Sequence, residues 1–130
     1  GGDIGLINWT PEGFVGQMFA VMKPYAPPPP PGASPPPLWG NEAHLADLLG
    51  DRVDDLRMER RALRVTEFAS GAEFRDFFKT NYGPTIVTYR AIGDDPDRVA
   101  DLDAALAELG DASLTDGVME WEYLLATARR

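Results

Sequence analysis

The stretch that decides the fold is Ile4-Gly5-Leu6-Ile7-Asn8-Trp9, followed at once by Thr10-Pro11-Glu12. The first run is apolar on both faces, which is typical of a strand covered on both sides, as in parallel α/β sheets. Thr10 as N-cap, Pro11 at the first helical position and Glu12 in the first turn predict a helix over residues 11–23. A strand that passes directly into a helix predicts an α/β fold.

Four further helices are expected, each from its apolar period and from the residues that begin and end it. Asn41 caps the first of them, and Ser70 opens the second as part of a capping box with Glu73. Their ranges are 41–50, 70–83, 85–92 and 95–110.

Two segments change to a period of two and predict antiparallel strands with helices inserted between them. The first covers residues 56–68 and is expected as one long bent strand or as two strands. The second covers residues 118–127, where Trp121 and Tyr123 are expected on one face and Glu120 and Glu122 on the other.

Composition limits the class of protein. The chain has 130 residues, 44% of them hydrophobic, which predicts a single domain over residues 1–130. Cysteine is absent, which excludes disulfides, thiol catalysis and Cys-ligated metal sites. The net charge of −9 repels phosphate backbones and anionic lipids, and no apolar run approaches the length of a membrane span. We therefore expect a cytoplasmic protein with no nucleic-acid or membrane partner.

The chain opens on a strand, without an initiator methionine or a signal sequence, and we therefore expect a piece cut from a longer gene product. Cutting beside an apolar strand leaves backbone groups unpaired, so self-association of this piece is expected.

Residues 24–39 form a proline-rich segment that predicts polyproline II conformation. One interpretation is a stiff spacer that Tyr25, Leu38 and Trp39 pin to the surface. The other is a ligand for SH3 or WW domains, which would make the chain a non-enzymatic interaction module.

Catalytic signatures are missing from the sequence. It holds no metal-ligand spacing, nucleophile elbow or phosphate-binding loop. His44 is the single histidine and the one candidate base, although a lone histidine usually serves structure. Aromatic residues lie near the expected loops and can line a pocket or build a core.

The opening residues 1–16, with the strand, the Trp9-Thr10-Pro11 turn and Gly13, resemble the fifth strand and following helix of class I S-adenosylmethionine-dependent methyltransferases. Residues 27–41, 77–85 and 122–124 are similar to a bacterial subgroup of the ubiquinone/menaquinone-biosynthesis-like type. The resemblance implies the C-terminal part of a Rossmann-like methyltransferase sheet, with one parallel-type strand and then antiparallel strands.

In that family the Gly-rich cofactor loop and the acidic residue that binds the ribose lie upstream of this strand. The resemblance therefore implies S-adenosylmethionine as cofactor of the full-length enzyme, no cofactor-binding residue in this piece, and no activity of the piece alone. A small-molecule methyl acceptor would lie near the carboxyl end of the first strand. The substrate-binding residues expected from this placement are Trp9, Thr10, Phe14, Trp39 and Tyr82.

Overall fold

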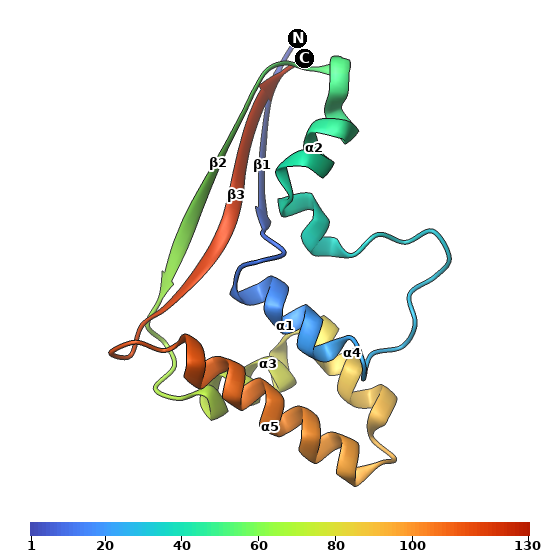
Figure 1. Ribbon diagram of the computed structural model, residues 1–130, viewed down its shortest axis with the longest axis vertical. Helices are drawn as coiled ribbons and strands as arrows, with labels where there is room; N and C mark the ends of the chain where they lie inside the picture. The colour runs from blue at the N-terminus through green and yellow to red at the C-terminus, as the bar shows by residue number, and fades with distance from the viewer. The chain divides into compact units, whose positions relative to one another are not determined.

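The computed structural model describes all 130 residues, which form two compact units (Figure 1). The first unit comprises residues 1–17, 32–63 and 120–130, and the second comprises residues 18–31 and 64–119. The fold is α/β, with one three-stranded antiparallel sheet and five α-helices. The expectation of an α/β fold with helices inserted among antiparallel strands is confirmed. The first strand, which was expected to be of the parallel type, pairs antiparallel with the last strand of this chain.

The sheet is built from β1 (Asp3–Trp9), β2 (Asp54–Val65) and β3 (Met119–Arg129) in the order β1-β3-β2. The strand β3 therefore lies in the middle, and it runs opposite to both neighbours (Figure 1). Its register with β1 extends from Asp3 opposite Arg129 to Trp9 opposite Tyr123. Of the two interpretations for residues 56–68, the single long strand is correct, although it begins and ends a few residues earlier.

One face of the sheet carries the core of the first unit. Leu124 and Ala126 of β3 are buried together with Leu45 of α2 (Glu42–Leu49). Leu6, Met58 and Leu49 pack around them. The prediction that the apolar side chains of residues 118–127 share one face of the strand is thus only half right. Trp121 is buried on one side of the strand, but Leu124, Ala126 and Ala128 are buried on the other, where α2 covers the sheet.

The opposite face of β1 is open within this chain. Exposure alternates along the strand, and the side chain of Ile7 is 68% exposed. Residues 4–9 are therefore apolar on both faces of the strand, but this chain covers only one of those faces. Its hydrogen-bonded neighbour in the sheet is β3 alone.

The helix α1 (Phe14–Met22) starts later than the sequence predicts. The expected first turn at Pro11 is a bend, and the hydroxyl of Thr10 accepts a hydrogen bond from the N–H of Gly13 at 3.0 Å. Thr10 therefore caps a turn that precedes the helix. The prediction of a helix start at Pro11 was wrong, since α1 begins at Phe14; the hydroxyl of Thr10 also donates to Glu122 of β3.

The short 3₁₀ helix η1 (Pro36–Gly40) leads into α2, and the turn η2 (Gly50–Arg52) follows α2. As predicted, Asn41 caps α2, since its side-chain oxygen accepts from the N–H of His44 at 2.9 Å. Gly40 lies against the carbonyl oxygen of Trp9. A side chain at position 40 would collide with that backbone, so glycine is required there.

The second unit is helical and contains α3 (Gly71–Asn81), α4 (Gly83–Ile92) and α5 (Pro96–Ser113). Residues 85–92 are helical as predicted. Ser70 caps α3 by accepting from the N–H of Glu73 at 3.2 Å, but the carboxylate of Glu73 accepts from Ala69 rather than from Ser70. The core of this unit contains the buried side chains of Phe74, Phe78, Ile92, Leu102 and Leu106.

The expected end of the last helix at Gly110 was wrong, since α5 continues to Ser113. Gly110 is a buried residue within the helix, at the point where α3 packs against α5. The backbone of Gly71 lies against Gly110 and against the carbonyl oxygen of Ala107. Glycine at position 110 therefore marks a close helix crossing, not a helix terminus.

Candidate functional site

The residues that follow β1 form a polar network in the first unit. Thr10 is fully buried, and its hydroxyl donates a hydrogen bond to Oε1 of Glu122 at 2.8 Å. The backbone N–H of Thr10 donates to the carbonyl oxygen of Glu122 at 3.2 Å. These bonds fix the end of β1 to the start of β3.

Arg60 of β2 lies close to three carboxylates, one of which is the Glu122 carboxylate that Thr10 contacts. Its guanidinium lies 2.9 Å from Glu42, 3.2 Å from Glu122 and 3.6 Å from Glu12. The hydrogen bond to Glu42, followed by the charges of Glu12 and Glu122, raises the pKa of Arg60. Three carboxylates and one guanidinium leave an excess of negative charge, which favours hydroxyl or amino groups of a ligand over phosphates. We call Thr10, Glu12, Glu42, Arg60 and Glu122 the rim network.

Aromatic rings stand beside the rim network. Phe14 stacks on Trp121 with ring centres 5.3 Å apart and planes 10° from parallel. Trp9 meets Trp121 edge to face at 5.9 Å and Tyr123 at 6.4 Å. Two predicted substrate-binding residues, Trp9 and Phe14, are thus brought together through Trp121, and Thr10 lies between them in sequence.

Trp39 and His44 belong to the same unit. The side chain of Trp39 in η1 is 44% exposed, and its role as an anchor of the proline-rich segment stays a prediction. Pro37 and Gly40 are the buried residues of that turn. His44 is half-buried in the first turn of α2, and its imidazole forms no hydrogen bond or ion pair within the chain.

Tyr82 lies in the second unit and does not share a compact unit with the other predicted site residues. Its ring contacts Phe78 at 5.0 Å and Phe19 at 6.4 Å between centres. Burial raises the pKa of its hydroxyl. These contacts make Tyr82 part of the aromatic packing of α3.

Asp103 is the centre of a second polar cluster, which joins the three helices of the second unit. Tyr89 donates to Oδ1 of Asp103 at 2.6 Å, and Nζ of Lys79 lies 3.0 Å from the same oxygen and 4.4 Å from the centre of the Tyr89 ring. Burial alone would raise the pKa of Asp103, but the hydrogen bonds from Tyr89 and Lys79 outweigh it and hold that pKa below its ordinary value. Burial and the neighbouring carboxylate raise the pKa of Tyr89.

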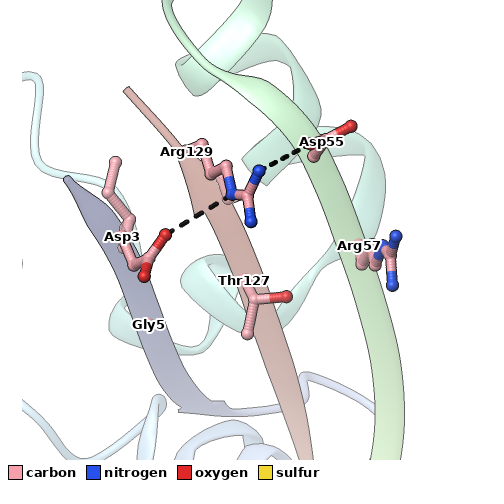
Figure 2. Close-up of a pocket in the computed structure, with 8 residues that line it drawn as sticks. Asp3, Gly5, Asp55, Arg57, Thr127 and Arg129 are labelled. Carbon is pink, nitrogen blue, oxygen red and sulfur yellow. Dashed lines mark ion pairs between the residues drawn. The ribbon is translucent and has the colours of Figure 1, made fainter. Parts of the chain in front are cut away.

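A shallow hollow of about 520 Å³ lies on the open face of the sheet (Figure 2). Gly5 and Thr127 are among the residues that line it, and a side chain at position 5 would meet no atom within 4 Å. Arg129 bridges the strands, 3.6 Å from Asp3 and 3.9 Å from Asp55, while Arg57 stands at the edge of β2. No group of three or more acidic or histidine side chains is placed to hold a metal ion.

Glu122, Arg60 and Trp121 were not identified as site residues from the sequence. In the sequence, Glu122 and Arg60 fit the polar positions of surface strands, and Trp121 fits an ordinary core position. Glu122 lies 112 residues from Thr10, so no local pattern connects them.

No helix of the chain is both long and apolar enough to cross a membrane.

No protein-family model matches this sequence, and no solved structure matches it. The chain is 49% identical over 130 residues to an uncharacterized protein of Mycobacterium tuberculosis and to one of Mycobacterium bovis. A second uncharacterized protein of Mycobacterium tuberculosis is 48% identical over the same length. All of this chain is matched, but it spans 47% of each of these relatives, which is about half of their length.

Proposed function

We propose that this chain is the C-terminal, substrate-side portion of a S-adenosylmethionine-dependent methyltransferase that acts on a small molecule. The observation that carries the proposal is the strand order, with the last strand antiparallel between two strands that run the same way. The family that the opening residues resemble ends its sheet with a strand inserted in this manner. The order supports the resemblance independently of the residues that suggested it.

The chemistry of methyl transfer explains what such a portion would contribute. The sulfonium methyl group must be held in line with a nucleophilic acceptor atom, in a pocket that excludes water. The cofactor supplies the activated methyl group. The protein supplies position, and the rim network with the Trp9, Phe14 and Trp121 rings provides polar and aromatic contacts on one side of such a pocket.

Within this proposal the rim network orients the acceptor. The oxygens of Glu122, Glu12 and Glu42 are hydrogen-bond acceptors, and the Glu122 carboxylate is fixed by Thr10 and Arg60. A hydroxyl or amino group of the acceptor could donate to these carboxylates as it approaches the methyl group. His44 lies on α2 two residues after Glu42 and remains the one candidate base with an imidazole.

The missing cofactor half is proposed to lie in the part of the longer relatives that this chain does not span. The 130-residue chain should therefore show no binding of S-adenosylmethionine in a calorimetric titration. A protein that includes the full length of the relatives should bind it in a one-to-one complex at micromolar concentration. If the longer protein also fails to bind the cofactor, the methyltransferase proposal is wrong.

A second candidate function is a non-enzymatic module that presents its proline-rich segment to a partner protein. Residues 27–31 are exposed, as a polyproline II ligand would require. Pro37 is buried in η1, so only the first proline run remains accessible along its length. A peptide of residues 24–39 that binds no SH3, WW or profilin-type domain in fluorescence anisotropy would count against this function.

A further inference from the structure

The carboxylate of Glu122 is held through one of its two oxygens. Oε1 accepts a hydrogen bond from the hydroxyl of Thr10 at 2.8 Å and another from Nη1 of Arg60 at 3.2 Å. The other oxygen, Oε2, forms no hydrogen bond within the chain. It is accessible to solvent, and the side chain of Glu122 is 37% exposed. The two oxygens therefore have different surroundings, one bound to the chain and the other open.

The direction of the hydrogen bonds at Oε1 is fixed. The N–H of Gly13 donates to the hydroxyl oxygen of Thr10 at 3.0 Å, and the single proton of that hydroxyl is directed to Glu122, because an ionised carboxylate only accepts. A guanidinium has donors only, so Arg60 also donates to Oε1. A proton on Oε1 would break these bonds. A proton that Glu122 takes up is therefore bound at Oε2.

The backbone around Thr10 keeps this arrangement in place. Thr10 is fully buried, and its N–H donates to the carbonyl oxygen of Glu122 at 3.2 Å. A side chain at position 13 would collide with Oγ1 of Thr10 and with Cβ of Glu122, so the turn lies directly against the base of the Glu122 side chain. All of these contacts join residues of the first compact unit. None of them depends on the part of the longer relatives that the chain does not span.

Glu122 and His44 differ in how the chain orients them. Bases that take a proton from a reacting group are typically held in position by a third group. The imidazole of His44 forms no hydrogen bond or ion pair within the chain, so no polar contact sets its direction. The Glu122 carboxylate has two donors on one oxygen and a free second oxygen. Glu122 therefore meets the geometric requirement that His44 does not meet.

We propose that Glu122 accepts the proton of the methyl acceptor at Oε2 and that Thr10 is the residue that positions it. This inference rests on the proposed methyltransferase function and concerns an acceptor with a hydroxyl or amino group. The O–H or N–H bond of the acceptor breaks, and its proton moves to Oε2 of Glu122. The electron pair left on the acceptor atom forms the bond to the methyl carbon, and the pair of the broken carbon–sulfur bond stays on sulfur.

The first test needs neither cofactor nor acceptor. Glu122→Gln keeps a carbonyl oxygen for Thr10 and Arg60 and places its NH₂ group where Oε2 lies. The melting temperature of the 130-residue protein should therefore stay within about 2 °C of wild type. Glu122→Leu removes the acceptor of a buried hydroxyl, and it should lower the melting temperature by about 4 °C or more. Equal losses in the two variants would show that Oε2 is bound within the chain and would overturn the proposal.

The second test measures methyl transfer by a protein with the full length of the relatives. Tyramine is the probe, since it carries both a phenolic hydroxyl and a primary amine. Glu122→Gln should lower kcat by about 100-fold or more, the usual contribution of a general base, with an unchanged Kd for S-adenosylmethionine. Glu120→Gln, at an exposed position of the same strand, is the matched control and should leave kcat unchanged.

The pH profile of kcat separates proton transfer from a structural role. The wild-type rate should fall at acid pH, because a protonated Oε2 accepts no further proton, and the residual rate of Glu122→Gln should lack this acid limb. The other two carboxylates beside Arg60, those of Glu12 and Glu42, are unchanged in this variant. The comparison of the two profiles therefore isolates Glu122.

Substitutions of Thr10 test its positioning role in the same assay. Thr10→Val should lower kcat by about tenfold or more, because the carboxylate of Glu122 loses the bond that orients it. Thr10→Ser should restore most of this loss, since a serine hydroxyl can make the same two hydrogen bonds. Equal losses in both variants would reject Thr10 as the positioning residue.

The results distinguish this inference from the methyltransferase proposal. A longer protein that binds no S-adenosylmethionine in calorimetry rejects the methyltransferase proposal, and this role of Glu122 with it. A protein that binds the cofactor but transfers no methyl group to tyramine keeps the first proposal and overturns the inference as stated. Glu122→Gln with the wild-type kcat and acid limb would also reject Glu122 as the proton acceptor.

Discussion

Thr10 and Glu122 are joined by a side-chain hydrogen bond of 2.8 Å, although 112 residues separate them in the sequence. The same hydroxyl of Thr10 accepts from the N–H of Gly13 at 3.0 Å. One buried group therefore fixes both the turn after β1 and the carboxylate of β3. This bond holds the Glu122 carboxylate beside Arg60 in the rim network.

Thr10→Val should destabilise the protein by about 1–3 kcal/mol, because it leaves the N–H of Gly13 and an oxygen of Glu122 without their partner. Urea unfolding followed by tryptophan fluorescence would measure the loss. Thr66→Val is the control, since Thr66 is exposed and its hydroxyl makes no hydrogen bond. Equal effects of the two substitutions would show that the hydroxyl of Thr10 contributes nothing to stability.

Trp9→Ala should affect acceptor use more than cofactor binding in the longer protein. Trp9 lies at the end of β1 beside Trp121 and Tyr123, where the proposal places the acceptor. We expect the KM for the acceptor to rise about tenfold or more, with little change in the Kd for S-adenosylmethionine. Calorimetry and initial rates would separate the two constants. Equal losses in both, together with a lower melting temperature, would assign Trp9 to the core alone.

Gly71→Ala should destabilise the second unit by about 1–3 kcal/mol, the usual cost of overpacking. A side chain at position 71 would collide with the carbonyl oxygen of Ala107 and with the backbone of Asp111. Gly83→Ala is the matched control, because nothing lies within 4 Å of a side chain there and its backbone is helical. Thermal unfolding should show a lower melting temperature for the first variant and an unchanged or higher one for the second.

The Asp103 cluster makes part of the stability depend on pH. Because folding lowers the pKa of Asp103, its contribution is present above the ordinary carboxyl pKa of about 3.9 and is lost as the pH falls through the lower, folded value. Lys79→Met should cost about 1 kcal/mol at neutral pH, a value reduced by the partial exposure of Lys79 and Asp103.

Urea unfolding of both proteins between pH 7 and pH 2.5 would measure this cost. The difference between wild type and Lys79→Met should shrink towards the acid end, as Asp103 becomes protonated. Lys23→Met is the control, since Lys23 is exposed and forms no ion pair. A difference that stays constant across the pH range would assign the effect of Lys79 to packing on Tyr89 rather than to the charge of Asp103.

The sequence by itself determined the local structure of this protein. Asn41 and Ser70 cap helices as predicted, because an N-cap bond joins residues three apart and needs no tertiary contact. The long strand β2 and the strand β3 follow from a period of two, and α4 follows from its place between two helices. The α/β class results from the sum of these elements.

Only the tertiary structure decided how distant residues meet. Thr10, expected as the N-cap of a helix, bonds to Glu122 of β3 instead of starting α1. Gly110, expected at a helix end, lies within α5 against Gly71. The carboxylates around Arg60 come from a loop, a helix and a strand that are far apart in the sequence. Local propensity is set by neighbouring residues, whereas these contacts depend on how the sheet and helices pack, and no sequence period records that packing.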